Sequence, residues 1–141
     1  MIAVHDLEQA KRQYHDLLGA TFMDADWTGE PFGISVAIAW DAGIELCAPM
    51  PGREKDSAIS QFLAQRGEGV MNVFFGVDDG NAAMERAAAQ NYDCVNALDY
   101  TQAEIDQHLG GLFARYQEFT LNSGPRCGFA ITLAQIDQKG D

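Results

Sequence analysis

The sequence of 141 residues is poor in basic residues, cysteine and proline, and it contains no long apolar run. Lys and Arg number 9 against 21 Asp and Glu, which gives a formal charge of −12. Because such a chain repels phosphate groups, neither nucleic acid nor an anionic membrane surface is an expected partner. No apolar segment approaches the roughly 20 residues that a membrane helix needs, so no membrane span is expected.

The three cysteines are too few and too scattered to form a scaffold. Cys47, Cys94 and Cys127 are odd in number, far apart and in no CxxC pair. This spacing argues against a disulfide framework and against a zinc knuckle. The sequence therefore predicts reduced thiols and a cytoplasmic protein.

An apolar fraction of 47% in a chain of this length predicts one globular domain. Asp6 is a typical N-terminal cap of a helix, and apolar residues recur at helical spacing after it. Gly19 is typical of a helix end, so a helix is predicted between these two residues. Residues 57–66 predict a connecting helix, residues 82–90 an Ala-rich helix after Asp79, and residues 101–110 a short polar helix. The predicted strands are residues 20–27, 33–40, 43–48, 70–77, 93–100, 113–121 and 128–136.

The order of these elements repeats. Val4, Asp6 and Ala10 match Val77, Asp79 and Ala83 at an offset of 73 residues. Three matched positions are weak by themselves, but they accompany a repeated order of strand, helix and three strands. We therefore predict an α+β fold with two tandem βαβββ modules, module 1 at about residues 1–50 and module 2 at about 69–137.

Four segments carry a family resemblance: IAVHDLEQAKRQYHDLLG, GIELCAP, GEGVMNVFFGVDD and CGFAITLAQ. With the two modules, they resemble the vicinal oxygen chelate superfamily, which includes glyoxalase I, methylmalonyl-CoA epimerase, extradiol dioxygenases and bleomycin resistance proteins. The resemblance covers nearly the whole chain. It implies a curved mixed sheet around a concave cavity, a small-molecule ligand and a homodimer.

The resemblance also implies a divalent metal held by one ligand from each of four strands. The usual first His falls two residues before Met1, and the second position is Asn72. The third is retained as Glu45 and the fourth is Thr132. A single carboxylate among these positions is a poor match to an open metal centre with three or more protein ligands. The sequence therefore predicts no metal and no other cofactor.

Alternation along the strands predicts which side chains line the cavity. If the bulkier set of each strand packs under the helices, the other set faces the cavity. The expected ligand-binding residues are Ser35, Glu45, Cys47, Asn72, Phe74, Tyr116, Glu118 and Thr132, with Ala37 and Thr120 on the same wall. Two acids among aromatic rings suit a cationic or aromatic ligand.

Each of these residues has a structural alternative. Glu45 is a vestigial metal ligand or a ligand-binding acid, and Glu118 binds a ligand or faces solvent. Asn72 and Thr132 are also consistent with ordinary polar residues of strands. His5 and His15 are expected on the surface, whereas His108 is the one histidine that could lie over the cavity. Trp27 and Trp40 are more typical of packing than of stacking on a ligand.

Two functions from different classes follow. The first is a metal-free protein that binds a small cationic or aromatic molecule without changing it. The second is a lyase, isomerase or dioxygenase, either metal-dependent or using Glu45 and Glu118 as acid and base. Metal retained through dialysis would favour the second.

Overall fold

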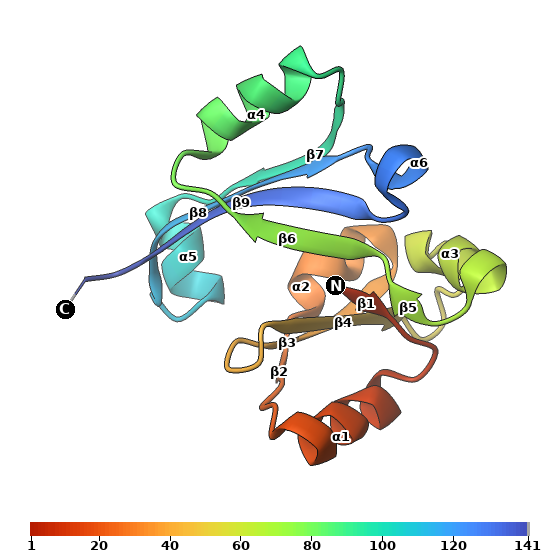
Figure 1. Ribbon diagram of the computed structural model, residues 1–141. Helices are drawn as coiled ribbons and strands as arrows, with labels where there is room; N and C mark the ends of the chain where they lie inside the picture. The colour runs from red at the N-terminus through yellow and green to blue at the C-terminus, as the bar shows by residue number, and fades with distance from the viewer. Residues whose placement is uncertain (141) are drawn as a thin grey trace. The chain divides into compact units, whose positions relative to one another are not determined.

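The chain divides into two units, Met1–Met71 and Asn72–Asp141. A computed structural model describes residues 1–140 (Figure 1). Unit 1 contains β1 (Ile2–Ala3), α1 (Leu7–Leu18), β2 (Met23–Asp24), α2 (Asp26–Gly29), η1 (Glu30–Phe32), β3 (Ile34–Ala39), β4 (Ile44–Pro49), α3 (Ala58–Arg66) and β5 (Gly69–Val70). Unit 2 contains β6 (Asn72–Gly76), α4 (Gly80–Ala89), β7 (Cys94–Asp99), α5 (Gln102–His108), β8 (Phe113–Leu121), α6 (Gly124–Cys127) and β9 (Ala130–Gln138). None of the helices within residues 1–140 is long and apolar enough to cross a bilayer.

The two sheets share one topology. The strand order is β2-β3-β4-β1-β5 in unit 1 and β6-β9-β8-β7 in unit 2. In each unit the first strand pairs in parallel with the strand that closes the βαβββ order, β1 with β4 and β6 with β9, and the remaining neighbours are antiparallel, including β5, which adds to the β1 edge in unit 1. The repeated α+β order predicted from the sequence is confirmed.

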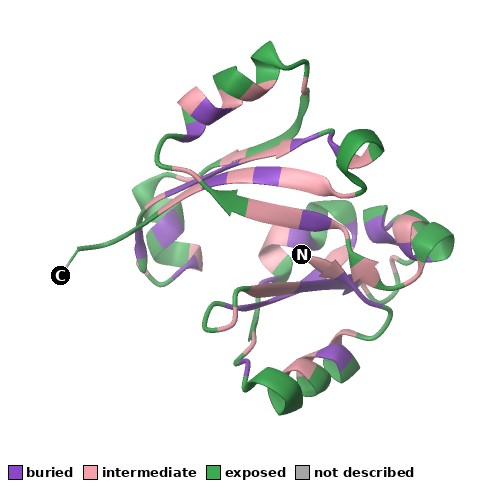
Figure 2. Cartoon of the chain, viewed as in Figure 1, coloured by how far each residue is buried: buried purple, intermediate pink, exposed green. Residues whose placement is uncertain are grey.

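The first helix forms where its caps predict. The Asp6 carboxylate accepts the backbone N–H of Gln9 at 2.9 Å, and Gly19 ends the helix with φ of 72°. A side-chain cap of this kind stabilises a helix by about 1 kcal/mol. Inward-facing Ala10 packs on Leu46 and Ala48 of β4, while Figure 2 shows most of α1 exposed. The buried stripe is therefore narrow, and small residues let the helix approach the sheet closely.

The predicted strand over residues 20–27 is largely wrong. Only Met23–Asp24 pairs with β3, and Trp27 lies in the short helix α2. The Asp26 carboxylate accepts the N–H of Val36 at 2.8 Å, and the Thr28 hydroxyl donates to the Ala25 carbonyl at 2.8 Å. These bonds, one of them to a residue ten positions away, take the place of the strand ladder.

The strand predicted over residues 70–77 is interrupted at Met71, so that β5 belongs to unit 1 and β6 to unit 2. The short helix α6 lies between β8 and β9, where the sequence predicted no helix. By contrast, α5 begins as expected after Thr101, whose hydroxyl and Glu104 form a capping box.

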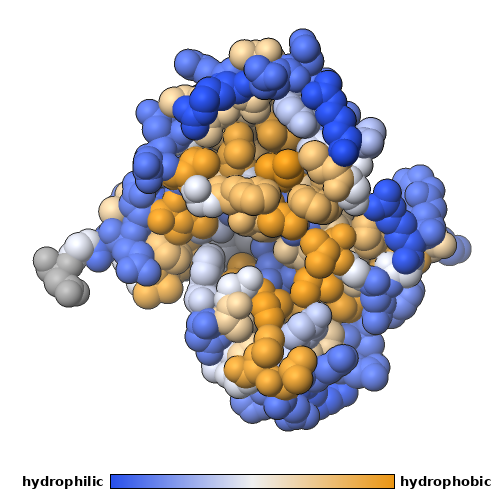
Figure 3. Space-filling view, viewed as in Figure 1, coloured by the Kyte–Doolittle hydropathy of each residue, from blue (hydrophilic) through white to orange (hydrophobic). Residues whose placement is uncertain are grey.

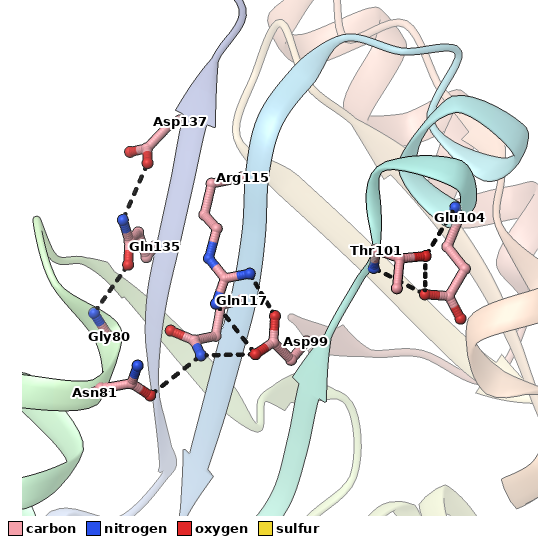
Figure 4. A network of polar contacts seen from close by, with 9 residues as sticks. All are labelled: Gly80, Asn81, Asp99, Thr101, Glu104, Arg115, Gln117, Gln135 and Asp137. Atoms are coloured by element: carbon pink, nitrogen blue, oxygen red, sulfur yellow. Dashed lines mark hydrogen bonds and ion pairs between the residues drawn. The ribbon is translucent and has the colours of Figure 1, made fainter.

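The first helix of unit 2 is fixed to its sheet by a polar network (Figure 4). Gln117 on β8 is 2% exposed, and its Nε2 donates to Asn81 Oδ1 at 3.2 Å and to Asp99 Oδ2 at 3.1 Å. Gln135 on β9 accepts the N–H of Gly80 at 3.1 Å. Figure 3 shows hydrophilic side chains on the outer side of α4 and hydrophobic ones between the helix and the sheet. One face of this sheet is therefore covered by α4.

Candidate functional site

The face of the unit 2 sheet opposite α4 collects the polar side chains that the sequence singled out. Thr120 pairs with Thr132, Phe74 also pairs with Thr132, and Glu118 pairs with Ala134. Directly paired residues share a face of a sheet. We call this the polar face of unit 2; its predicted members, all on the same side, are Asn72, Phe74, Tyr116, Glu118, Thr120 and Thr132.

One end of the polar face holds a hydroxyl–amide cluster. Asn72 Nδ2 donates to Thr132 Oγ1 at 2.8 Å, and Thr132 Oγ1 lies 3.1 Å from Asn72 Oδ1. Thr120 Oγ1 lies 2.9 Å from Thr132 Oγ1, and either hydroxyl is able to donate. Thr132 is fully buried, and Asn72 is also buried. Buried polar atoms that bond to one another in this way fix their side chains in place.

The other part of the polar face holds a carboxyl among aromatic rings. The Tyr116 hydroxyl donates to Glu118 Oε1 at 2.7 Å. The ring of Tyr116 stacks on Tyr100, with centroids 5.4 Å apart, and lies 5.8 Å from the ring of Phe113. Tyr100 was not among the predicted residues, although it follows β7 beside Tyr116 and its N–H bonds to the Tyr116 carbonyl at 3.1 Å. Strand pairing, which the sequence does not reveal, brings it to the site.

The electrostatics of this cluster are set by burial. Glu118 is 8% exposed, and burial raises the pKa of its carboxyl, while the Tyr116 hydroxyl opposes that rise. Burial also raises the pKa of Tyr100, and the charge of Glu118 adds to that effect. Within residues 1–140 Glu118 forms no ion pair at 4 Å or less. The polar face therefore contains a buried acid whose hydrogen-bonding partner is a neutral hydroxyl.

Unit 1 does not present the wall that the sequence predicted. Ser35 pairs with Ala48 and Ala37 with Leu46, so both lie on the α1 side. Glu45 lies on the opposite side, because it pairs with Ile38. The prediction that Ser35 and Ala37 share a face with Glu45 and Cys47 is wrong: the small residues of β3 lie under α1, where the helix comes close, and the bulky ones lie on the other side.

Cys47 does share a face with Glu45, but it is packed in a core. It is fully buried beside Ile59 and Leu63 of α3. Its Sγ donates to the Ile2 carbonyl at 3.3 Å. Burial is the main cause that raises the pKa of this thiol, and the negative charge of Glu45 raises it further. Glu45, on the same side of the unit 1 sheet as Cys47, is half-buried.

The donor set of the chain does not fit the divalent metal that the resemblance implies. Within residues 1–140 there is no group of three His, Cys, Asp or Glu side chains placed to hold an ion. In unit 2 the two corresponding positions are Asn72 and Thr132, neutral residues bonded to each other. A catalytic metal centre uses imidazole, thiolate or carboxylate ligands. We derive no chemical step through a metal.

Unit 1 also contains a cavity of about 220 Å³ between α1, β1 and the start of β5. It lies on the α1 side of the sheet, and no predicted ligand-binding residue lines it. The lining residues are Ile2, Val4, Asp6, Gln9, Ala10, Gln13, Tyr14, Glu68 and Gly69.

The repeated order of strands is that of a glyoxalase-like fold. A family model, "Glyoxalase/Bleomycin resistance protein/Dioxygenase superfamily", matches residues 1–109. The chain belongs to this superfamily. No curated protein matches the sequence closely enough to serve as a relative.

Solved structures are similar over nearly the whole chain. Methylmalonyl-CoA epimerase from Mycobacterium tuberculosis is 25% identical, with a TM-score of 0.68, covering 99% of this chain and 85% of that one. A hypothetical protein from Bacillus halodurans C-125 is 17% identical, with a TM-score of 0.72 and coverage of 99% and 93%. A Streptomyces coelicolor methylmalonyl-CoA epimerase variant in complex with 2-nitronate-propionyl-CoA is 21% identical, with a TM-score of 0.69 and coverage of 95% and 91%. The last two show the fold alone.

Proposed function

We propose that this protein binds a small cationic ligand with apolar or aromatic parts on the polar face of unit 2, without a resident metal. The observation that carries this proposal is the buried carboxyl of Glu118, which has a neutral hydroxyl as its partner. A buried carboxylate is costly unless a cation pairs with it. An ammonium group of the ligand supplies that cation.

The aromatic rings support the same class of ligand. Tyr100 and Tyr116 stack beside Glu118, and the half-buried ring of Phe74 lies on the same face. A cation over such a ring gains about 0.5–2 kcal/mol. The hydroxyl–amide cluster of Asn72, Thr120 and Thr132 offers polar groups to the uncharged part of the ligand. The formal charge of −12 attracts cations and increases their rate of arrival.

Calorimetric titration with benzyltrimethylammonium, which combines an aromatic ring with a permanent positive charge, tests the proposal. Glu118→Gln keeps the shape and the acceptor for Tyr116 but removes the charge. We expect it to weaken binding by about tenfold or more, because a charged contact contributes about 1.5–3 kcal/mol. Glu85→Gln, at an exposed site on α4, is the matched control and should bind as the wild type does. Equal binding by wild type and Glu118→Gln, or no saturable binding, contradicts the proposal.

A second candidate is an isomerase, and the likeness to methylmalonyl-CoA epimerase over 99% of the chain favours it. In this case Glu118 acts as an acid or base beside a carbonyl. Incubation with methylmalonyl-CoA in D₂O, followed by mass spectrometry, tests it: deuterium incorporation that Glu118→Gln abolishes would establish the activity. We rank it second because CoA carries several phosphate charges, which a chain with a formal charge of −12 repels.

We also propose, from the family resemblance, that the protein is a cytoplasmic homodimer. Light scattering coupled to size exclusion tests the dimer, and a mass of 15.4 kDa, that of one chain, would contradict it. Fractionation of the source cells tests the location.

A further inference from the structure

Within residues 1–140, Glu118 forms no ion pair at 4 Å or less. On its two neighbouring strands the paired residues are Leu98 of β7 and Ala134 of β9. The titratable groups that face it are the phenols of Tyr116 on β8 and Tyr100 beside β7. In α5, Glu104 acts on Tyr100, and His108 in turn acts on Glu104.

This environment favours the uncharged form of the carboxyl. Burial penalises the carboxylate, and the hydrogen bond from Tyr116 recovers a part of that penalty. A carboxyl in such a place holds its proton to a higher pH than a surface carboxyl does. A bound cation reverses the balance, because it stabilises the carboxylate directly.

We propose that ligand binding on the polar face exchanges the proton of Glu118 for the cation of the ligand. The inference rests on the proposed function. The carboxyl releases its proton to solvent, the carboxylate pairs with the ligand cation, and no other bond changes. The net charge of the site is therefore the same before and after binding. Affinity for a permanent cation rises with pH through the range in which Glu118 titrates, and it levels off once the free protein is ionised there.

Calorimetry with benzyltrimethylammonium between pH of about 4 and about 8 tests this exchange, since the probe itself does not titrate. At each pH the titration is repeated in two buffers with different ionisation enthalpies, which gives the number of protons released. We expect release approaching one proton at the acidic end, with affinity rising by up to about tenfold per pH unit there. Glu118→Gln should lose both the proton release and its share of the pH dependence.

Two matched variants separate Glu118 from its neighbours. His108→Asn removes the histidine of α5, and Glu85→Gln removes an exposed acid elsewhere. Both should keep the pH dependence. A ¹³C NMR titration of the Glu118 carboxyl in the ligand-free protein, assigned with Glu118→Gln, measures the protonation without any ligand. It should titrate above the surface carboxyls.

The outcomes distinguish the two proposals. If the probe binds with the same affinity at every pH and releases no proton, the exchange is wrong while the proposed function stands. The exchange is likewise wrong if the Glu118 carboxyl titrates with the surface carboxyls. If the probe does not bind at any pH, both the proposed function and the exchange are wrong.

Discussion

Replacing Thr132 by Val tests whether the hydroxyl–amide cluster holds the polar face together. Valine has nearly the shape of threonine, so the substitution removes one buried hydroxyl and leaves the packing. Thr132 is fully buried, and its Oγ1 lies 2.8 Å from Asn72 Nδ2 and 2.9 Å from Thr120 Oγ1. A single change therefore removes the central atom of the cluster.

The expected loss of stability follows from these contacts. Buried polar groups that lose a hydrogen-bonding partner cost about 1–3 kcal/mol, so Thr132→Val should lower the free energy of unfolding by about that amount. Thr120→Val should cost less, about 0.5–1.5 kcal/mol, because Thr120 makes one hydrogen bond of 2.9 Å in the cluster and is partly exposed. The double variant should lose less than the sum, with a coupling of about 0.5–1.5 kcal/mol.

Urea unfolding followed by circular dichroism measures all four proteins of this cycle. A Thr132→Val protein as stable as the wild type, or a double variant whose loss equals the sum of the single losses, would show that the hydroxyl does not bond to its neighbours. The reasoning about the cluster would then fail.

Three further predictions concern other parts of the chain. Gly29→Ala should destabilise unit 1 by about 2 kcal/mol or more in urea unfolding, because a Cβ would meet the β3 backbone, whereas Gly124→Ala has open space and should be better tolerated. Cys94 and Cys127 are exposed and should react quickly with Ellman's reagent in the native protein, while the buried third thiol should react only on unfolding; three rapid equivalents would contradict this. Burial raises the pKa of Glu118 in the folded state, so the contribution of its protonation to the free energy of unfolding is present at low pH and is lost as pH rises through that pKa. In urea unfolding, the stability of Glu118→Gln relative to the wild type should therefore increase with pH. A difference in stability that stays constant with pH would contradict this direction.

The helices were predictable wherever local chemistry defined both ends. Asp6 and Gly19 limit α1, and Thr101 with Glu104 starts α5, because the caps are made by residues close in sequence. The region of Trp27 was not predictable in this way. There the Asp26 carboxylate bonds to Val36, a residue ten positions away.

The polar face of unit 2 was predictable for a related reason. On β8 the polar Glu118 alternates with the apolar Phe119 and Leu121, so the pattern itself separates the two sides of the strand. On β3 the alternation is between Val36 or Ile38 and small residues, and both sets are buried. Such a strand has no polar side to face outward, so its sequence does not say which set lies under the helix.

The sequence by itself determined the repeated order of elements, the helix ends and the shared face of the residues on β6, β8 and β9, because these depend on local bonding and on the two-residue period of a strand. Only the tertiary structure decided that Ser35 lies under α1 and that Tyr100 stacks on Tyr116. The burial that raises the pKa of Glu118 also comes from the fold. These features depend on register between strands and on neighbours that are distant in sequence, which no local pattern contains.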